Sequence, residues 1–142
     1  MNIKNAKKLR IESEASMFAG YYFSGNAVKQ TLSIHSDGRV FWNQYYLTDK
    51  YEKHRIEYHR FKIDTDKARK ILEMAGDFLM EPDMVCACDA GSWFMLLETE
   101  SGEKYYNEGP LVEMDDRLTE IGSMIRLETG EKKIWAFDWE EE

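Results

Sequence analysis

The chain has 142 residues, of which 43% are hydrophobic and 13% aromatic, and its formal net charge at pH 7 is −8. Such a chain is expected to fold as a single domain, residues 1–142, that buries a core without disulfide bonds or a metal. The acidic balance disfavours nucleic-acid binding, and the longest apolar run, Trp93–Leu97, is too short to cross a membrane.

Charge is distributed unequally along the sequence. Residues 1–72 hold 14 Lys and Arg against 8 Asp and Glu, whereas residues 73–142 hold 5 against 19. This distribution indicates either a charged partner or two halves that attract each other, within one monomer or across a homodimer. Cys86 and Cys88 are too close in sequence for an unstrained mutual disulfide, and no apolar signal segment follows the basic N-terminal residues. These features predict a cytoplasmic protein.

The first half predicts four strands, and Ser36-Asp37-Gly38 predicts a hairpin between the second and third. The third strand has apolar side chains on both faces and is expected in the sheet interior. A change of apolar parity in the fourth predicts a β-bulge near His59-Arg60, or an early end of the strand. The predicted strands are Ala15–Phe23, Val28–Ile34, Val40–Leu47 and His54–Ile63.

The second half predicts a helix, a hairpin, a second helix and a last strand. Thr65 is the expected N-cap of the first helix, and Pro82 ends it. Apolar residues from Leu111 to Ile125 step by three and four, which predicts a helix that opens at Gly109-Pro110 and stops at Thr129-Gly130. The other elements predicted here are strands Ser92–Thr99, Lys104–Glu108 and Lys133–Trp139. The order predicts an α+β fold, a mainly antiparallel sheet of six to seven strands with two amphipathic helices on one face.

Four residues could supply catalytic or metal-binding chemistry: Cys86, Cys88, His54 and His59. A structural zinc site normally uses four ligands with two to four residues between paired cysteines, and only one residue separates these two. A cysteine nucleophile needs a neighbouring base, and no nucleophile elbow or Gly-rich oxyanion loop marks one. Small buried side chains explain both cysteines better. We therefore predict no catalytic residue, metal site or cofactor, and keep a small enzyme with a His/Cys pocket as an alternative.

The most distinctive local pattern runs from Asp89-Ala90-Gly91-Ser92-Trp93, through Ser101-Gly102-Glu103, to Gly109-Pro110. Over about residues 88–125 it resembles small uncharacterised α+β proteins (a domain of unknown function) of Firmicutes-type bacteria. Those proteins combine an Asp-rich turn, a Trp in the next strand, a Gly-containing hairpin and Gly-x-x-Pro before a helix. Here Gly109 and Pro110 are adjacent. The resemblance implies a bacterial α+β fold fragment and nothing about chemistry.

Acidic residues and paired aromatics carry the functional prediction. Adjacent tyrosines on a strand place one ring on each face, so some rings are expected outside the core. We predict a non-enzymatic protein-binding module, of inhibitor, immunity or adaptor type, that engages another protein through an acidic face and an aromatic sheet surface, with a basic partner favoured. A homodimer whose charge-sorted halves pair is the alternative. The predicted partner-binding residues are Asp115, Asp116, Glu120, Trp135, Asp138 and Trp139.

Overall fold

The computed structural model describes residues 3–14, 28–47, 53–82, 91–111 and 115–137, with side chains described except at 46–47 and 53–57. Within these ranges the chain forms six strands and two helices. In chain order the elements are β1 (Ala6–Glu14), β2 (Lys29–His35), β3 (Arg39–Leu47), β4 (Lys53–Lys62), α1 (Thr65–Met80), β5 (Ser92–Thr99), β6 (Lys104–Pro110) and α2 (Asp116–Thr129).

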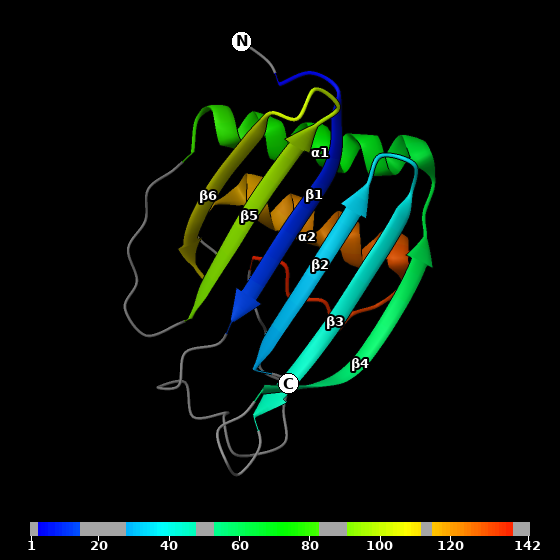
Figure 1. Cartoon of the computed structure of the whole chain (residues 1–142), viewed down its shortest axis with the longest axis vertical. Coiled ribbons are helices and arrows are strands. Elements are labelled where there is room, and N and C mark those ends of the chain that lie inside the picture. Colours follow the sequence, from blue (N-terminus) through cyan, green and yellow to red (C-terminus); the bar gives the residue numbers. More distant parts are fainter. Residues whose placement is uncertain (1–2, 15–27, 48–52, 83–90, 112–114, 138–142) are drawn as a thin grey trace.

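The six strands form one antiparallel sheet in the order β4-β3-β2-β1-β5-β6. Figure 1 shows this sheet toward the reader, with both helices behind it. The prediction of an α+β fold with a mainly antiparallel sheet is confirmed, and β3 lies in the sheet interior as its two-sided apolarity indicated. Hydrophobic side chains of β1, β2, β3 and β5 face the helices and form the core with them.

The strand at the centre of the sheet was not predicted. β1 pairs with both β2 and β5, and so joins the first four strands to the second hairpin. In β1, Leu9, Ile11 and Ser13 are buried on the inner face, while Lys8, Arg10 and Glu12 alternate with them. Because only two of the inward side chains are large and apolar, the pattern resembles a charged N-terminal segment rather than a central strand. The predicted strand Ala15–Phe23 lies outside the described residues.

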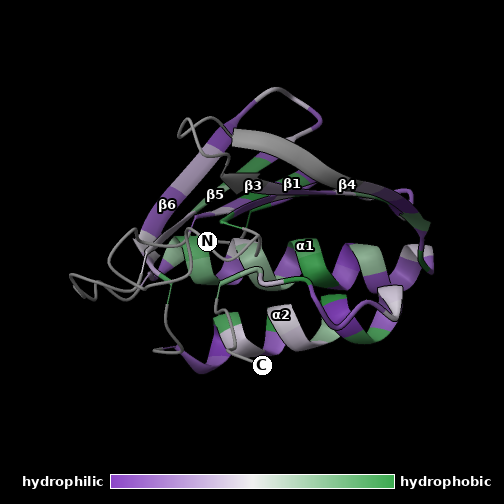
Figure 2. Cartoon of the chain, turned by 90° about the horizontal axis from the view of Figure 1, so that it is seen from below, coloured by the Kyte–Doolittle hydropathy of each residue, from purple (hydrophilic) through white to green (hydrophobic). Residues whose placement is uncertain are grey.

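Helix α1 covers the inner face of the sheet directly. Its buried stripe, Ala68, Ile71, Leu72, Ala75 and Phe78, faces the sheet, and the helix contacts β1, β2, β5 and β6. Figure 2, a view along the sheet edge, shows both helices on the same side of the sheet. The predicted cap was one residue late, since the carboxylate of Asp64 accepts the N–H of Asp66 and Thr65 is already helical. A carboxylate at this position also satisfies the positive end of the helix dipole.

Helix α2 begins later than predicted and packs against α1. Gly109 and Pro110 are the last residues of β6, and Asp115 caps the helix. Gly109 is required where it stands because the Trp93 ring lies over it, and an added Cβ would come within 2.6 Å of the ring. The predicted stop is confirmed, since Gly130 takes a left-handed conformation (φ 72°) and donates its N–H to Arg126.

The chain after α2 does not form the predicted strand Lys133–Trp139 within its described part. Residues 131–137 are an irregular segment whose Ile134, Ala136 and Phe137 side chains are all buried. Side chains, rather than a neighbouring strand, bind its backbone: the Ser13 hydroxyl donates to Ala136 O, and the Arg126 guanidinium donates to Ile134 O at 3.0 Å. The alternating sequence pattern predicted a strand, but the described part of this segment has no strand conformation.

The predicted hairpins are confirmed. Strand β4 contains a bulge, but the parity change lies after it, because Tyr58 faces outward and Phe61 inward in unbroken register. Gln44 pairs with Glu57 but Tyr45 pairs with Arg55, so Ile56 is the extra residue of a bulge. The irregularity thus lies three residues before the predicted His59-Arg60 position. After the bulge, Tyr58 and Arg60 share a face with Phe41 and Asn43, opposite to the core.

Candidate functional site

Asp115, predicted to bind a partner, is the N-cap of α2. Its carboxylate accepts the backbone N–H of Arg117 at 2.8 Å and two guanidinium bonds from the same residue, at 3.2 and 2.9 Å. The residue is only 8% exposed. The Arg117 guanidinium also lies over the Phe78 ring, 4.9 Å from its centroid. The Asp115 carboxylate thus caps α2, and Arg117 links this cap to α1 through Phe78.

Of the other predicted partner-binding residues, the structure describes Asp116, Glu120 and Trp135. Asp116 and Glu120 are exposed on α2, one helical turn apart. Trp135 is half-buried against the core, and its backbone N–H donates to Gln30 Oε1 at 2.8 Å. Asp138 and Trp139 lie outside the described residues. Figure 2 shows α2 on one side of the sheet, and the cross-strand register places Tyr58 and Tyr106 on the other face of the sheet.

The histidine and cysteine alternative gains no geometric support from the described residues. The His59 ring stacks on Trp42, with 5.4 Å between centroids, and on Phe61, with 6.1 Å. Cys86, Cys88 and the side chain of His54 fall outside the described part. In that part no three His, Cys, Asp or Glu side chains are grouped as metal ligands.

A larger surface stands out on the side of the sheet away from the helices, which we name the outer sheet face. The cross-strand register shows which residues lie on this face. Ser33 pairs with Phe41 on one side and with Arg10 on the other; Phe41 pairs with Arg60, and Arg10 pairs with Leu96. Six strands at about 4.8 Å spacing make this face about 24 Å wide. Its central and neighbouring rows hold Arg60, Phe41, Ser33, Arg10, Leu96, Tyr106, Tyr58, Asn43, Thr31, Glu12, Phe94 and Glu108.

Aromatic rings on this face are accessible. Tyr106 on β6 is 70% exposed and Tyr58 on β4 is 43% exposed. Phe94 is half-buried and lies beside Tyr106, with 6.1 Å between ring centroids. An antiparallel sheet with one solvated face normally carries polar side chains there. This face differs from that norm because it carries aromatic side chains on both edge strands and on strands between them.

Charges on the outer sheet face differ between its two sides. The described outward side chains of β2, β3 and β4 include Lys29, His35, Arg39, Arg60 and Lys62, and none of them is acidic. The outward side chains of β1, β5 and β6 mix signs; Arg10 and Glu12, for example, form an ion pair at 2.8 Å. The sheet therefore presents a basic half with aromatic rings and a mixed half with aromatic rings.

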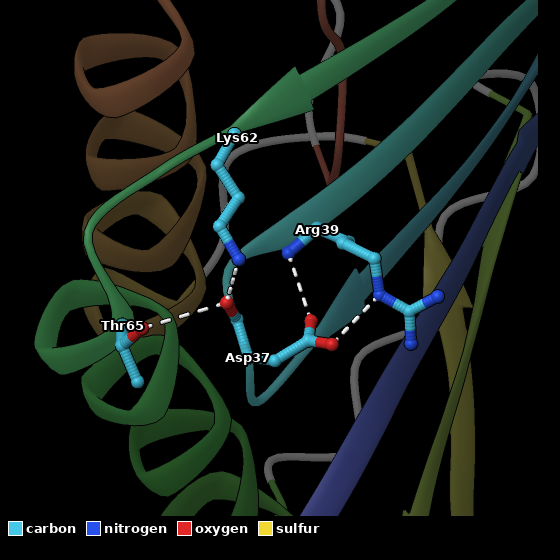
Figure 3. Close-up of polar contacts among 4 residues, drawn as sticks. All are labelled: Asp37, Arg39, Lys62 and Thr65. Carbon is cyan, nitrogen blue, oxygen red and sulfur yellow. Dashed lines mark hydrogen bonds and ion pairs between the residues drawn. The ribbon is translucent and has the colours of Figure 1, made fainter.

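The hairpin between β2 and β3 fixes one end of the basic half (Figure 3). The Asp37 carboxylate accepts the backbone N–H and the Nε–H of Arg39, at 3.1 and 2.7 Å. These bonds, the backbone one first, lower the pKa of Asp37. The carbonyl of Asp37 accepts from the Lys62 ammonium and from the Thr65 hydroxyl. The contacts attach the turn to the corner between β4 and α1.

The pKa of His35 is lowered by its partial burial and by two nearby positive charges. Its ring meets Phe41 edge-on at a centroid distance of 5.5 Å. Partial burial lowers the pKa of His35 most, and the positive charges of Arg39 and Lys8 lower it further, while the Asp37 carboxylate acts in the opposite direction. The imidazole is thus neutral over more of the pH range than an isolated histidine.

No protein-family model matches this chain, and no curated protein matches it. The resemblance of residues 88–125 to bacterial proteins therefore stays a prediction. No helix in the described ranges is long and apolar enough to cross a membrane.

The sequence contained a partial signal for the outer sheet face. Adjacent tyrosines such as Tyr105-Tyr106 predicted rings outside the core, and Tyr106 is 70% exposed on the outer sheet face. The choice of side could not be made without the register. The sequence does not show the basic character of this face, because the positive charges of β1 to β4 contribute only to an overall excess in residues 1–72.

Proposed function

We propose that this protein is a protein-binding module, of inhibitor, immunity or adaptor type, and that the outer sheet face is its contact surface. The observation that carries the proposal is the exposure of Tyr106 and Tyr58 on one sheet face at opposite edges. Tyrosine is enriched among the residues that dominate binding energy in protein interfaces, because its large ring is buried at low entropic cost and its hydroxyl still forms a hydrogen bond.

The dimensions of the face suit such a partner. Seven residues of β2 span about 20 Å, and with a width of about 24 Å the projected area is roughly 500 Å². A standard interface removes about 800 Å² of accessible surface from each partner, and a surface of side chains exposes more area than its projection. The outer sheet face is thus large enough for one interface of standard size.

Four large hydrophobic side chains are the exposed ones among the described residues, and they divide evenly between the two sides of the molecule. Tyr58 and Tyr106 lie on the outer sheet face, whereas Met80 and Leu127 lie on α1 and α2. This division supplies a matched control, because substituting either pair removes two exposed apolar groups from a different side.

The test is capture of binding proteins from a bacterial lysate by tagged wild type, Tyr58→Ser/Tyr106→Ser and Met80→Ser/Leu127→Ser. We expect the tyrosine variant to lose specific bands that the wild type and the helix-side variant both retain. Urea unfolding of all three proteins shows whether they are folded. Identical bands for the wild type and a folded tyrosine variant would contradict the proposal.

A further inference from the structure

We infer that the partner contacts the basic half of the outer sheet face with an acidic polypeptide segment, and that the contact is centred on Phe41. This inference deepens the proposed function and rests on it. The sequence alone favoured a basic partner, because its acidic residues outnumber its basic ones. The sheet register places positive charge on the side where the exposed rings lie.

Phe41 lies among basic side chains and a histidine. The Arg60 guanidinium lies over its ring at 5.5 Å from the centroid, and His35 meets the ring edge. Arg39 stands two residues before Phe41 on the same face, and Lys8 pairs across the sheet with His35. We name these five residues the Phe41 patch.

Part of the charge in the Phe41 patch is unneutralised. Arg39 is paired with Asp37 at 2.7 Å, but no described carboxylate forms an ion pair with Lys8 or Arg60. Arg60 is exposed, and its guanidinium already lies over an aromatic ring. A guanidinium held in this way loses less conformational entropy when a carboxylate docks against it in the bidentate arrangement.

A protein segment fits these observations better than a nucleic acid does. The whole chain carries −8, so a long polyanion would meet repulsion outside the patch, and screening over about 8 Å at physiological salt leaves only local contacts favourable. A segment with a few carboxylates and an apolar side chain for Phe41 uses those local contacts alone. The mixed half of the face, with Phe94 and Tyr106, would take the neutral part of the same partner.

The experiment measures fluorescence anisotropy of labelled peptides with the full chain. The probes are four repeats of Asp-Phe-Glu, the neutral Asn-Phe-Gln analogue, the basic Lys-Phe-Lys analogue and a dodecamer of thymidylate. We compare wild type with Arg39→Gln/Arg60→Gln. The matched control is Arg69→Gln/Lys70→Gln, which removes two positive charges from exposed positions on α1, on the helix side.

We expect the acidic peptide to bind wild type more tightly than the neutral and basic peptides do. The patch variant should weaken that binding about tenfold, which corresponds to about 1.4 kcal/mol, and the α1 variant should stay within about twofold of wild type. Raising the salt from about 50 to about 300 mM should weaken the wild-type complex and affect the patch variant less.

Four results would overturn the inference. Equal binding of acidic and neutral peptides, or equal loss in both double variants, means that the patch does not select carboxylates. Tighter binding of thymidylate than of the acidic peptide, lost in the patch variant, assigns the patch to a nucleic acid. A wild type that sediments as a dimer, with a monomeric patch variant, assigns it to a second copy of this chain. If tyrosine-dependent capture from the lysate persists in any of these cases, only the inference fails and the proposed function stands.

Discussion

Replacing Gln30 by Leu should weaken the attachment of residues 133–135 to the sheet. Gln30 is 3% exposed, and its amide forms four hydrogen bonds. Its Oε1 accepts from Trp42 Nε1 at 3.0 Å and from the Trp135 N–H at 2.8 Å. Its Nε2 donates to Lys133 O at 2.8 Å and to Gln44 Oε1 at 3.3 Å. Two donors and two acceptors fix the amide orientation, since the reversed amide would face donors with its N–H groups.

The expected loss follows from what each partner does afterwards. Trp42 is fully buried, so its indole N–H would stay unpaired, at a cost of about 1–3 kcal/mol. Lys133 is exposed and Trp135 half-buried, so their backbone groups can turn to water, and each bond lost there costs about 0.5–1.5 kcal/mol. The added apolar burial of Leu offsets part of this sum. We expect Gln30→Leu to lower the free energy of unfolding by about 2–4 kcal/mol.

Urea unfolding followed by tryptophan fluorescence measures this loss, with Gln44→Leu as the control. Gln44 lies opposite Gln30 on β3 and is also buried, but the hydrogen bond between the two side chains is long, at 3.3 Å. The control should lose about 0.5–1.5 kcal/mol. If both variants lose the same free energy of unfolding, and the slope of that free energy with urea concentration is unchanged, the reasoning that Gln30 acts through its four hydrogen bonds is refuted.

Two further predictions concern the β2–β3 hairpin. Gly38→Ala should lower the free energy of unfolding by about 2–3 kcal/mol, because φ is +97° and the new Cβ would stand 2.3 Å from the carbonyl oxygen of Ile63. Gly102→Ala, also at positive φ but with nothing within 4 Å, should lose only the conformational part, about 1–2 kcal/mol, and calorimetry of the two variants separates these contributions. In an NMR titration His35 should titrate below its ordinary pKa, and Arg39→Gln should raise that pKa because it removes a positive neighbour. Since the unfolded chain then binds the proton more readily than the folded one, His35 lowers stability as the pH falls below about 6.5, and replacing it by Gln should remove this pH dependence. A wild-type His35 pKa that does not respond to Arg39→Gln would contradict the assignment.

Local chemistry in the sequence determined most of the elements. Alternating Val40, Trp42 and Gln44, with a turn at Asp37-Gly38, specified the first hairpin, because strand period and turn conformation are set by neighbouring residues. The stripe from Ala68 to Phe78 specified α1 for the same reason. These patterns sufficed for an α+β fold with helices on one side.

Long-range contacts decided the rest. The central strand β1 shows few large apolar side chains, and its pairing with β5 joins residues about eighty positions apart, which no local pattern reports. The predicted last strand became an irregular segment because Gln30, Ser13 and Arg126 bind its backbone. Asp115 was predicted on a surface, but Arg117 encloses it.

The sequence by itself therefore determined composition, the sign of each half and the order of most elements, all of which depend on residues close together in the chain. The tertiary structure alone decided which charges share a surface. Register places Arg60 over Phe41 and beside Arg39, on the sheet face away from α2, although the three residues belong to two strands. A one-residue shift of β4, such as the bulge at Ile56 produces, exchanges the two faces of a strand, so the position of Tyr58 and Arg60 depends on pairing that the sequence pattern does not contain.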